Sequence, residues 1–256
     1  MTLYRIKLVC ITLILFIAGS GCKEKDELTL PVSIHLKIGI APSTPYNYDE
    51  YEYLGFGNSY IRVQRIRFEG EREAGEDVFF ETDPKIDLQT LEFGRQPATI
   101  SVFEIPQGIY YYMKWDINLK RITTEGIFDE NDTDSLHIGL VISGAYRSLD
   151  ELDEWGEALR IPFIIAIDDT ELFSVMSHNP EGTSSIVLSG NKNHEAILLL
   201  APYNAFLSIS RESFEEAVDI SRNNGRQIIL ISRNENEDLY ENLLYRILLS
   251  ARIVIK

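Results

Sequence analysis

The sequence predicts a mainly β protein, an antiparallel sandwich followed by a C-terminal α/β piece. Two patterns favour this fold class. Several segments alternate apolar and polar residues, which is typical of half-buried strands. Polar turns separate these segments at short spacing, as in a sandwich and unlike βαβ units. The last quarter of the chain changes to helical spacing, which predicts the α/β piece.

The strands are expected in the following order. The first alternates through Val32, Ile34, Leu36, Ile38 and Ile40. The second runs from Ile61 to Phe68 with a phase slip near Arg65, which indicates a bulge. The clearest strand runs from Ile109 to Leu119. We expect its odd-numbered residues, Tyr111 and Trp115 among them, on the apolar face and Tyr110 on the polar face. Later alternation is found at Leu136–Ile142, Ile161–Ile167 and Ile186–Leu188.

Two helices are expected near the C-terminus. Ser210 is placed to cap the first, and Asn236 is placed to cap the second. Short apolar runs at 228–231 and 253–255 predict two further strands. We therefore expect one β-sandwich domain over residues 30–200, with residues 201–256 as a helical segment packed on it.

Residues 1–21 have the features of a secretory signal. Arg5 and Lys7 precede an apolar stretch from Leu8 to Ala18, and small residues lead to Cys22. The stretch is shorter than the ~20 residues that a helix needs to cross a bilayer. A simple secretory signal, in which Cys22 has no role, is one interpretation of this pattern.

The run Gly19-Ser20-Gly21-Cys22 resembles the lipobox of bacterial lipoproteins. This resemblance implies that Cys22 is acylated, with palmitate or a similar chain, and becomes the new N-terminus. Residues 22–29 would then form a tether that holds the protein to the bacterial outer membrane. Lys25-Asp26-Glu27 is similar to the export signal of Bacteroidetes surface lipoproteins, so surface-facing and periplasm-facing locations both stay open.

Composition excludes several classes of partner. Forty acidic residues against 24 lysines and arginines give a net charge of −16, which repels phosphate backbones and anionic lipid. Nucleic-acid binding is therefore not expected, and membrane contact would depend on the lipid. Cys10 leaves with the signal. An acylated Cys22 then leaves the mature chain with no thiol for a disulfide, a metal or a nucleophile.

The whole strand pattern resembles a group of Bacteroidetes lipoproteins with a transthyretin-like β-sandwich, to which the fimbrillin adhesins are related. The segments that carry the resemblance are Tyr60–Phe68, Ile86–Leu88 and Ile105–Tyr110, within residues 30–200. The resemblance implies a Greek-key arrangement of the strands.

No motif predicts catalysis, a metal site or a cofactor. The nucleophile elbow, the Walker loop and the dinucleotide fingerprint are all missing, and His35, His137, His178 and His194 form no metal-binding pair. The run from Asp129 to Asp134 offers closely spaced oxygen atoms, as calcium loops do, but a solvated acidic turn is the interpretation we favour. We interpret Asp150–Trp155 in the same way, with Leu152 and Trp155 as a helical anchor pair.

The candidate binding residues are four tyrosines that alternate with acids in one loop, Tyr46, Tyr48, Tyr51 and Tyr53. Aromatic faces stack on sugars while carboxylates accept hydrogen bonds from hydroxyls, and the same mixture suits protein recognition. The alternative is that these rings cover the edge of the sandwich. The expected function is non-catalytic binding of a glycan or envelope protein, as an accessory or adhesin-like subunit. A structural lipoprotein in a multiprotein assembly is the alternative, and a carboxylate-dependent hydrolase is a remote one.

Overall fold

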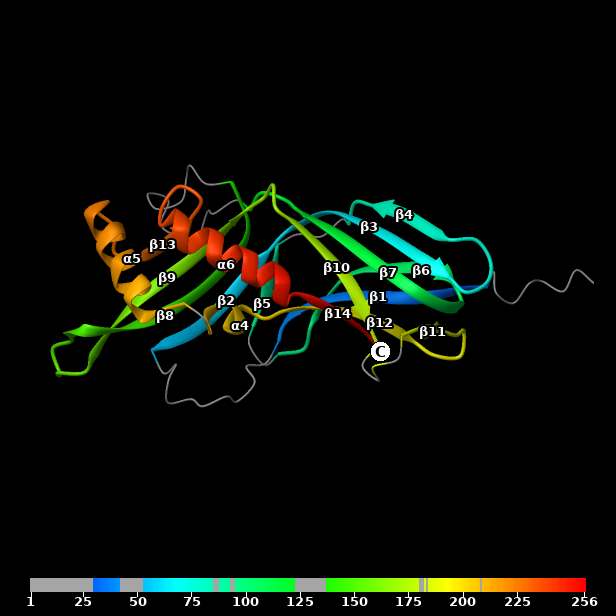
Figure 1. Ribbon diagram of the computed structural model, residues 1–256, viewed down its shortest axis with the longest axis horizontal. Helices are drawn as coiled ribbons and strands as arrows, with labels where there is room; N and C mark the ends of the chain where they lie inside the picture. The colour runs from blue at the N-terminus through cyan, green and yellow to red at the C-terminus, as the bar shows by residue number, and fades with distance from the viewer. Residues whose placement is uncertain are drawn as a thin grey trace, which may run out of the picture.

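A computed structural model describes residues 30–41, 53–84, 88–92, 95–122, 137–179, 182, 184–207 and 209–256. It confirms the mainly β, sandwich-like class, with two sheets and short helices close to the C-terminus. The molecule is elongated. β1 (Pro31–Ile40) begins at one end, and the hairpin between β8 (Ile138–Leu152) and β9 (Ala158–Asp168) turns at the opposite end (Figure 1).

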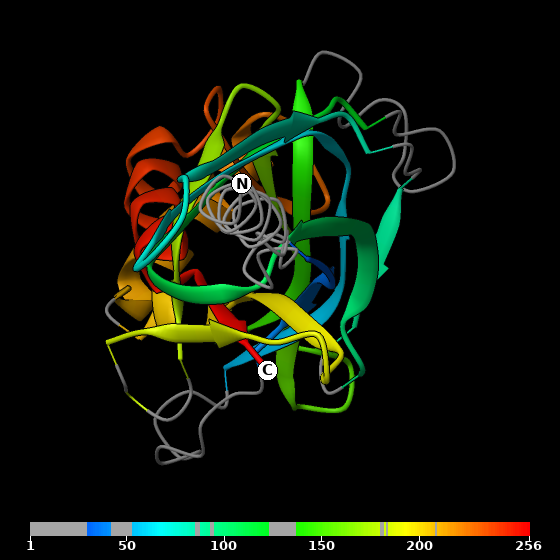
Figure 2. The ribbon, with the colours of Figure 1, turned by 90° about the vertical axis from the view of Figure 1, so that its right-hand side faces the viewer.

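The larger sheet curls around the long axis (Figure 2). Its two outermost strands approach each other. This is seen from the ring centroids of Phe80 and Phe103, one on each of these strands, which lie 4.8 Å apart. The order of its strands is β4 (Val78–Thr82), β3 (Val63–Arg72), β7 (Gly108–Leu119), β10 (Leu172–His178), β14 (Arg252–Ile255), β12 (His194–Leu200), β1 and β6 (Ala98–Pro106), with β11 (Ile186–Leu188) also on β7.

The smaller sheet is covered by helices. Phe206 and Phe214 from two of them contact Phe163 of β9 in this sheet. The order of its strands is β13 (Ile229–Ser232), β9, β8, β2 (Leu54–Ile61) and β5 (Gln89–Leu91), and the helices are α4 (Pro202–Phe206), α5 (Arg211–Asn223) and α6 (Glu237–Ser250). None of the helices in the described residues is long and apolar enough to span a membrane.

The C-terminal segment is built into both sheets rather than only packed against them. β13 lies beside β9 at one edge of the smaller sheet, and β14 lies between β10 and β12 in the larger one. Three pairs, β1–β12, β10–β14 and β13–β9, are parallel, while the other described pairs are antiparallel. One hydrophobic cluster includes buried residues of both sheets and of all three helices, so residues 30–200 and 201–256 share a core.

The predicted alternation is confirmed in β1, whose even-numbered residues from Val32 to Ile40 are buried. The predicted slip near Arg65 is confirmed as a shift of register between Val63 and Arg65 where β3 pairs with β7.

The prediction for the start of β7 was wrong. Tyr110 is buried, whereas Ile109 and Tyr111 are exposed. The cause is a second shift of register: Arg72 pairs with Tyr110 and Glu71 pairs with Tyr112, so one extra residue of β7 stands between them. Such a bulge reverses the faces of the residues before it. From Met113 to Leu119 the expected apolar face is buried.

We expect Trp115→Ala to lower the free energy of unfolding by ~3–5 kcal/mol, because a fully buried aromatic side chain would leave a cavity. Trp115 is buried, its ring lies 4.6 Å from that of Phe68, and its Nε1 donates to Ser177 Oγ at 2.8 Å. Chemical denaturation monitored by circular dichroism measures the change. Trp155→Ala is the matched control, because that side chain is exposed. Equal unfolding midpoints for both variants would contradict the assigned core.

Candidate functional site

The structure places one of the four candidate tyrosines. Tyr46, Tyr48 and Tyr51 lie outside the described residues, as does Cys22. Tyr53 is only 8% exposed. Its ring meets that of Tyr146 edge-on at 5.9 Å, and the guanidinium of Arg211 lies 5.2 Å above it. Tyr53 therefore packs against β8 and α5 and is not displayed for a ligand.

The other sequence candidates are not brought together. His194 is buried, and its Nε2 lies 3.1 Å from both the backbone nitrogen and the carbonyl oxygen of Ser189, which is a structural role. Within the described ranges, no group of three or more His, Cys, Asp or Glu side chains is placed to hold a metal ion. The acidic run from Asp129 to Asp134 lies outside those ranges.

The tip of the β8–β9 hairpin displays the most exposed large hydrophobic side chain among the described residues. Trp155 is 79% exposed, and Leu152 beside it is 64% exposed. The tip is a turn and not the helix we expected. The carboxylate of Asp153 accepts the N–H groups of Trp155 and Glu157, each at 2.9 Å, and Gly156 has a φ of +81°. Glycine adopts a left-handed backbone conformation without strain, and an Asp side chain that accepts N–H groups from later residues closes a turn.

Helix α5 braces this hairpin from the side. The Arg222 guanidinium binds the Glu151 carboxylate through two contacts, one of them 2.9 Å from Nη2 to Oε2. That hydrogen bond lowers the pKa of Glu151. Nearer the base of the hairpin, Tyr146 donates to Glu215 Oε1 at 2.5 Å, and Ser148 Oγ lies 3.3 Å from the same oxygen. Two attachments to one helix therefore hold β8 in place.

Tyr146 is the centre of the second attachment. Its ring is buried and stacks on Phe214 of α5 at 5.1 Å with an interplanar angle of 14°. Arg211, also on α5, approaches the Tyr146 hydroxyl at 3.4 Å and donates to the carbonyl oxygen of Arg147 at 2.8 Å. Burial, with the hydrogen bond to Glu215, raises the pKa of Tyr146. The phenol therefore stays protonated and keeps donating to Glu215.

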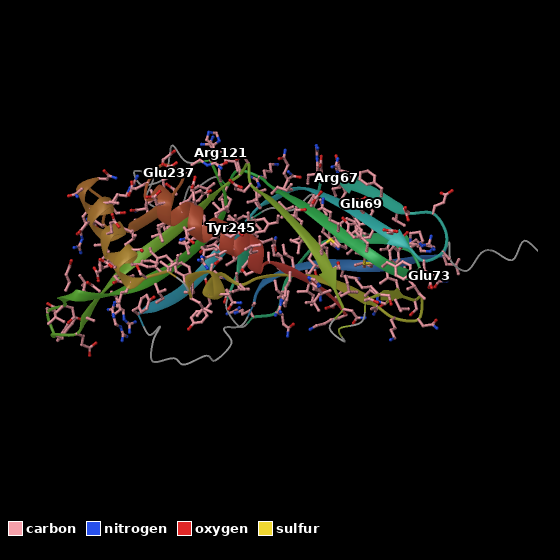
Figure 3. The ribbon with its side chains drawn as sticks, viewed as in Figure 1. Arg67, Glu69, Glu73, Arg121, Glu237 and Tyr245 are labelled. Atoms are coloured by element: carbon pink, nitrogen blue, oxygen red, sulfur yellow. The ribbon has the colours of Figure 1, made fainter. Side chains whose placement is uncertain are left out.

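A groove of about 440 Å³ separates the start of α5 from the start of α6. Its charged lining consists of carboxylates, those of Glu216, Glu237 and Asp238; Figure 3 labels Glu237 close to the hairpin end. Asn236 also lines the groove, but its Nδ2 donates to Leu230 O at 2.7 Å, and its Oδ1 has no hydrogen-bond partner among the described residues. Ser210 caps α5 as predicted, accepting from Ser213 N. The carboxylates that line the groove favour ligands that donate hydrogen bonds.

Trp155 at the hairpin end is therefore the candidate binding residue among the described ones, although the sequence pattern predicted that it lies on a helix. The signal that could have placed it is Asp153-Glu154-Trp155-Gly156, an Asp followed three residues later by Gly between two apolar strands.

We expect Tyr146→Phe to flatten the alkaline side of the stability profile. A tyrosine whose pKa is raised on folding adds stability below its unfolded pKa of ~10 and loses that contribution as the pH rises above it. Wild type should therefore lose free energy of unfolding between pH 9 and 11 more steeply than the variant. Urea titrations at each pH measure the slope. Parallel profiles would show that this phenol does not titrate differently in the folded protein.

No protein-family model, no curated protein and no solved structure matches this chain, so the geometry of the hairpin end and the groove stands without a relative to compare.

Proposed function

We propose that this chain is a lipid-anchored protein of the bacterial outer membrane that binds an envelope protein or a glycan without catalysis. The lipobox-like run ending at Cys22 supports the anchor, and the strand pattern that resembles Bacteroidetes lipoproteins supports the envelope location. The recognition surface in this proposal is the hairpin end, which lies opposite the end where β1 begins (Figure 1).

The single observation that carries the proposal is the exposed indole of Trp155 on a braced turn. When a partner covers a large exposed apolar side chain, apolar surface is removed from water, and this makes the free energy of binding more favourable. Trp is also the residue type most enriched among side chains that dominate binding energy. Loops held by a rigid sheet are where binding residues concentrate. The buried stack of Tyr146 on Phe214 and the contact between Glu151 and Arg222 both attach this hairpin to α5.

The surroundings of Trp155 define the chemistry of the partner. Glu154 and Glu157 flank it and are exposed, and Leu152 adds apolar surface. An indole face stacks on the C–H face of a sugar, while nearby carboxylates accept hydrogen bonds from its hydroxyls. The same set suits an apolar pocket with a basic rim on a protein.

A second candidate function, a structural role in a multiprotein assembly, is favoured by α6. Tyr245 and Leu249 stand one helical turn apart and are both exposed, and Figure 3 shows Tyr245 on the outer side of this helix. Such a stripe is typical of a helix that packs against another subunit.

We expect Trp155→Ala to reduce binding at least ~10-fold, because an interface Trp typically contributes more than ~1.4 kcal/mol. The probes are a glycan array and detergent extracts of Bacteroidetes envelopes, captured on immobilised residues 22–256 that carry Cys22→Ser. The melting temperature should not change, because Trp155 contacts solvent.

Tyr245→Ala is the matched control, because it removes another large exposed aromatic ring from a different surface. Binding lost in Tyr245→Ala and kept in Trp155→Ala would replace the proposal with the assembly alternative. Binding kept in both variants would remove the hairpin tip as the recognition surface.

A further inference from the structure

The point where the tether reaches the fold is well defined. Leu30 is partly exposed, and its carbonyl oxygen accepts from the backbone N–H of Gln107 at 2.9 Å. Gln107 lies in the turn between β6 and β7, so the chain before β1 joins the molecule beside that turn. This is the end of the molecule opposite the β8–β9 hairpin (Figure 1).

Exposed apolar side chains surround this point. Ile109 and Tyr111 stand on the outer side of β7, and Val187 on β11 pairs directly with Ile109. Val187 is 58% exposed. We call Leu30, Ile109, Tyr111 and Val187 the anchor-side patch. The bulge in β7 creates it, because without the extra residue Ile109 and Tyr111 would point inward and Tyr110 outward.

A buried cation holds the base of the anchor-side patch. Arg72 is 9% exposed, and its Nη2 donates to Gln107 O at 2.9 Å. Its Nη1 reaches Glu76 O at 3.4 Å, so one guanidinium joins the β3–β4 turn to the β6–β7 turn. The hydroxyl of Tyr110 donates to Pro106 O at 2.7 Å and fixes the same turn from inside. The patch is therefore displayed by bonded backbone rather than by a loose loop.

We propose that the anchor-side patch rests on the lipid surface and orients the molecule with its hairpin end away from the membrane. This inference rests on the proposed lipid anchor at Cys22. Residues 22–29 can span at most ~28 Å even when fully extended. Leu30 belongs to the patch and directly follows this segment, so an acylated Cys22 keeps that part of the patch within this distance of the headgroups. Because the tether makes this second contact intramolecular, weak interfacial affinity is enough to orient the molecule.

The composition of the patch selects the kind of lipid. Tyrosine favours the headgroup level of a membrane, and aliphatic side chains bury their apolar surface toward the acyl chains. Glu73 hydrogen-bonds Tyr111, and Figure 3 labels Glu73 at this end of the molecule. Glu71 on β3, and Glu76 and Asp77 in the turn between β3 and β4, are also exposed. These carboxylates repel an anionic surface, so the lipid surface that the patch contacts is zwitterionic.

The experiment places one fluorophore at either end of the acylated protein. The mature chain has no thiol apart from the acylated Cys22, so Val187→Cys and Leu152→Cys each accept a single environment-sensitive label. Leu152→Cys is the matched control, an exposed aliphatic residue at the hairpin end. In phosphatidylcholine vesicles with brominated acyl chains, the label at position 187 should be quenched and the label at position 152 should not. Adding Ile109→Ser to the Val187→Cys protein should restore its fluorescence.

Vesicle flotation separates the two proposals. Flotation that is lost in Cys22→Ser confirms the anchor independently of the labels. If the protein floats but both labels behave alike, the patch inference is overturned while the anchor stands. If the wild-type protein, isolated from membranes, does not float, both fall. Quenching at position 187 that grows when phosphatidylglycerol is added would overturn the commitment to zwitterionic lipid.

Discussion

The fold depends on β14, the short strand that ends the chain. It lies between β10 and β12 and joins two groups of strands, β4-β3-β7-β10 and β12-β1-β6, into one sheet. Ile253 pairs with Ser177 on one side and with Leu198 on the other, and it is fully buried. Because β10 and β12 have no direct pairing, the larger sheet is continuous only when the last residues are in place. The C-terminal segment is therefore a structural requirement of the sandwich.

The bulge in β7 shows how one extra residue serves packing and surface together. It turns the Tyr110 ring into the core, where the guanidinium of Arg72 lies 5.9 Å from it. Burial raises the pKa of Tyr110 to about 12, so the phenol stays protonated and donates to Pro106 O. The extra residue of the bulge also turns the Tyr111 side chain outward. A buried phenol and an exposed aromatic ring are thus consequences of one local irregularity.

The two ends of the molecule are built by different means. At the end where β1 begins, Arg72 donates to backbone carbonyl oxygens of two turns. At the hairpin end, Arg211, Glu215 and Arg222 of α5 bind groups on β8, so a helix supplies the rigidity. Exposed ion pairs such as Glu151–Arg222 contribute little to stability, typically ~0–1 kcal/mol. The buried ring of Tyr146, stacked on Phe214 of α5, therefore contributes more than this ion pair to holding the hairpin that carries Trp155.

Local patterns in the sequence determined the class of the fold and many of its elements. The alternation in β1, the slip near Arg65 and the cap at Ser210 each depend on neighbours within a few residues, so they could be predicted. The parallel pairs, the place of β14 and the bulge at Tyr111 depend on partners far along the chain, and only the tertiary structure decided them. The same limit applies to the site. Composition drew attention to Tyr53, but packing against Tyr146 and Arg211 buries it. Trp115 and Trp155 are the same residue type, and whether an indole is buried or displayed is decided by which strands and helices surround it.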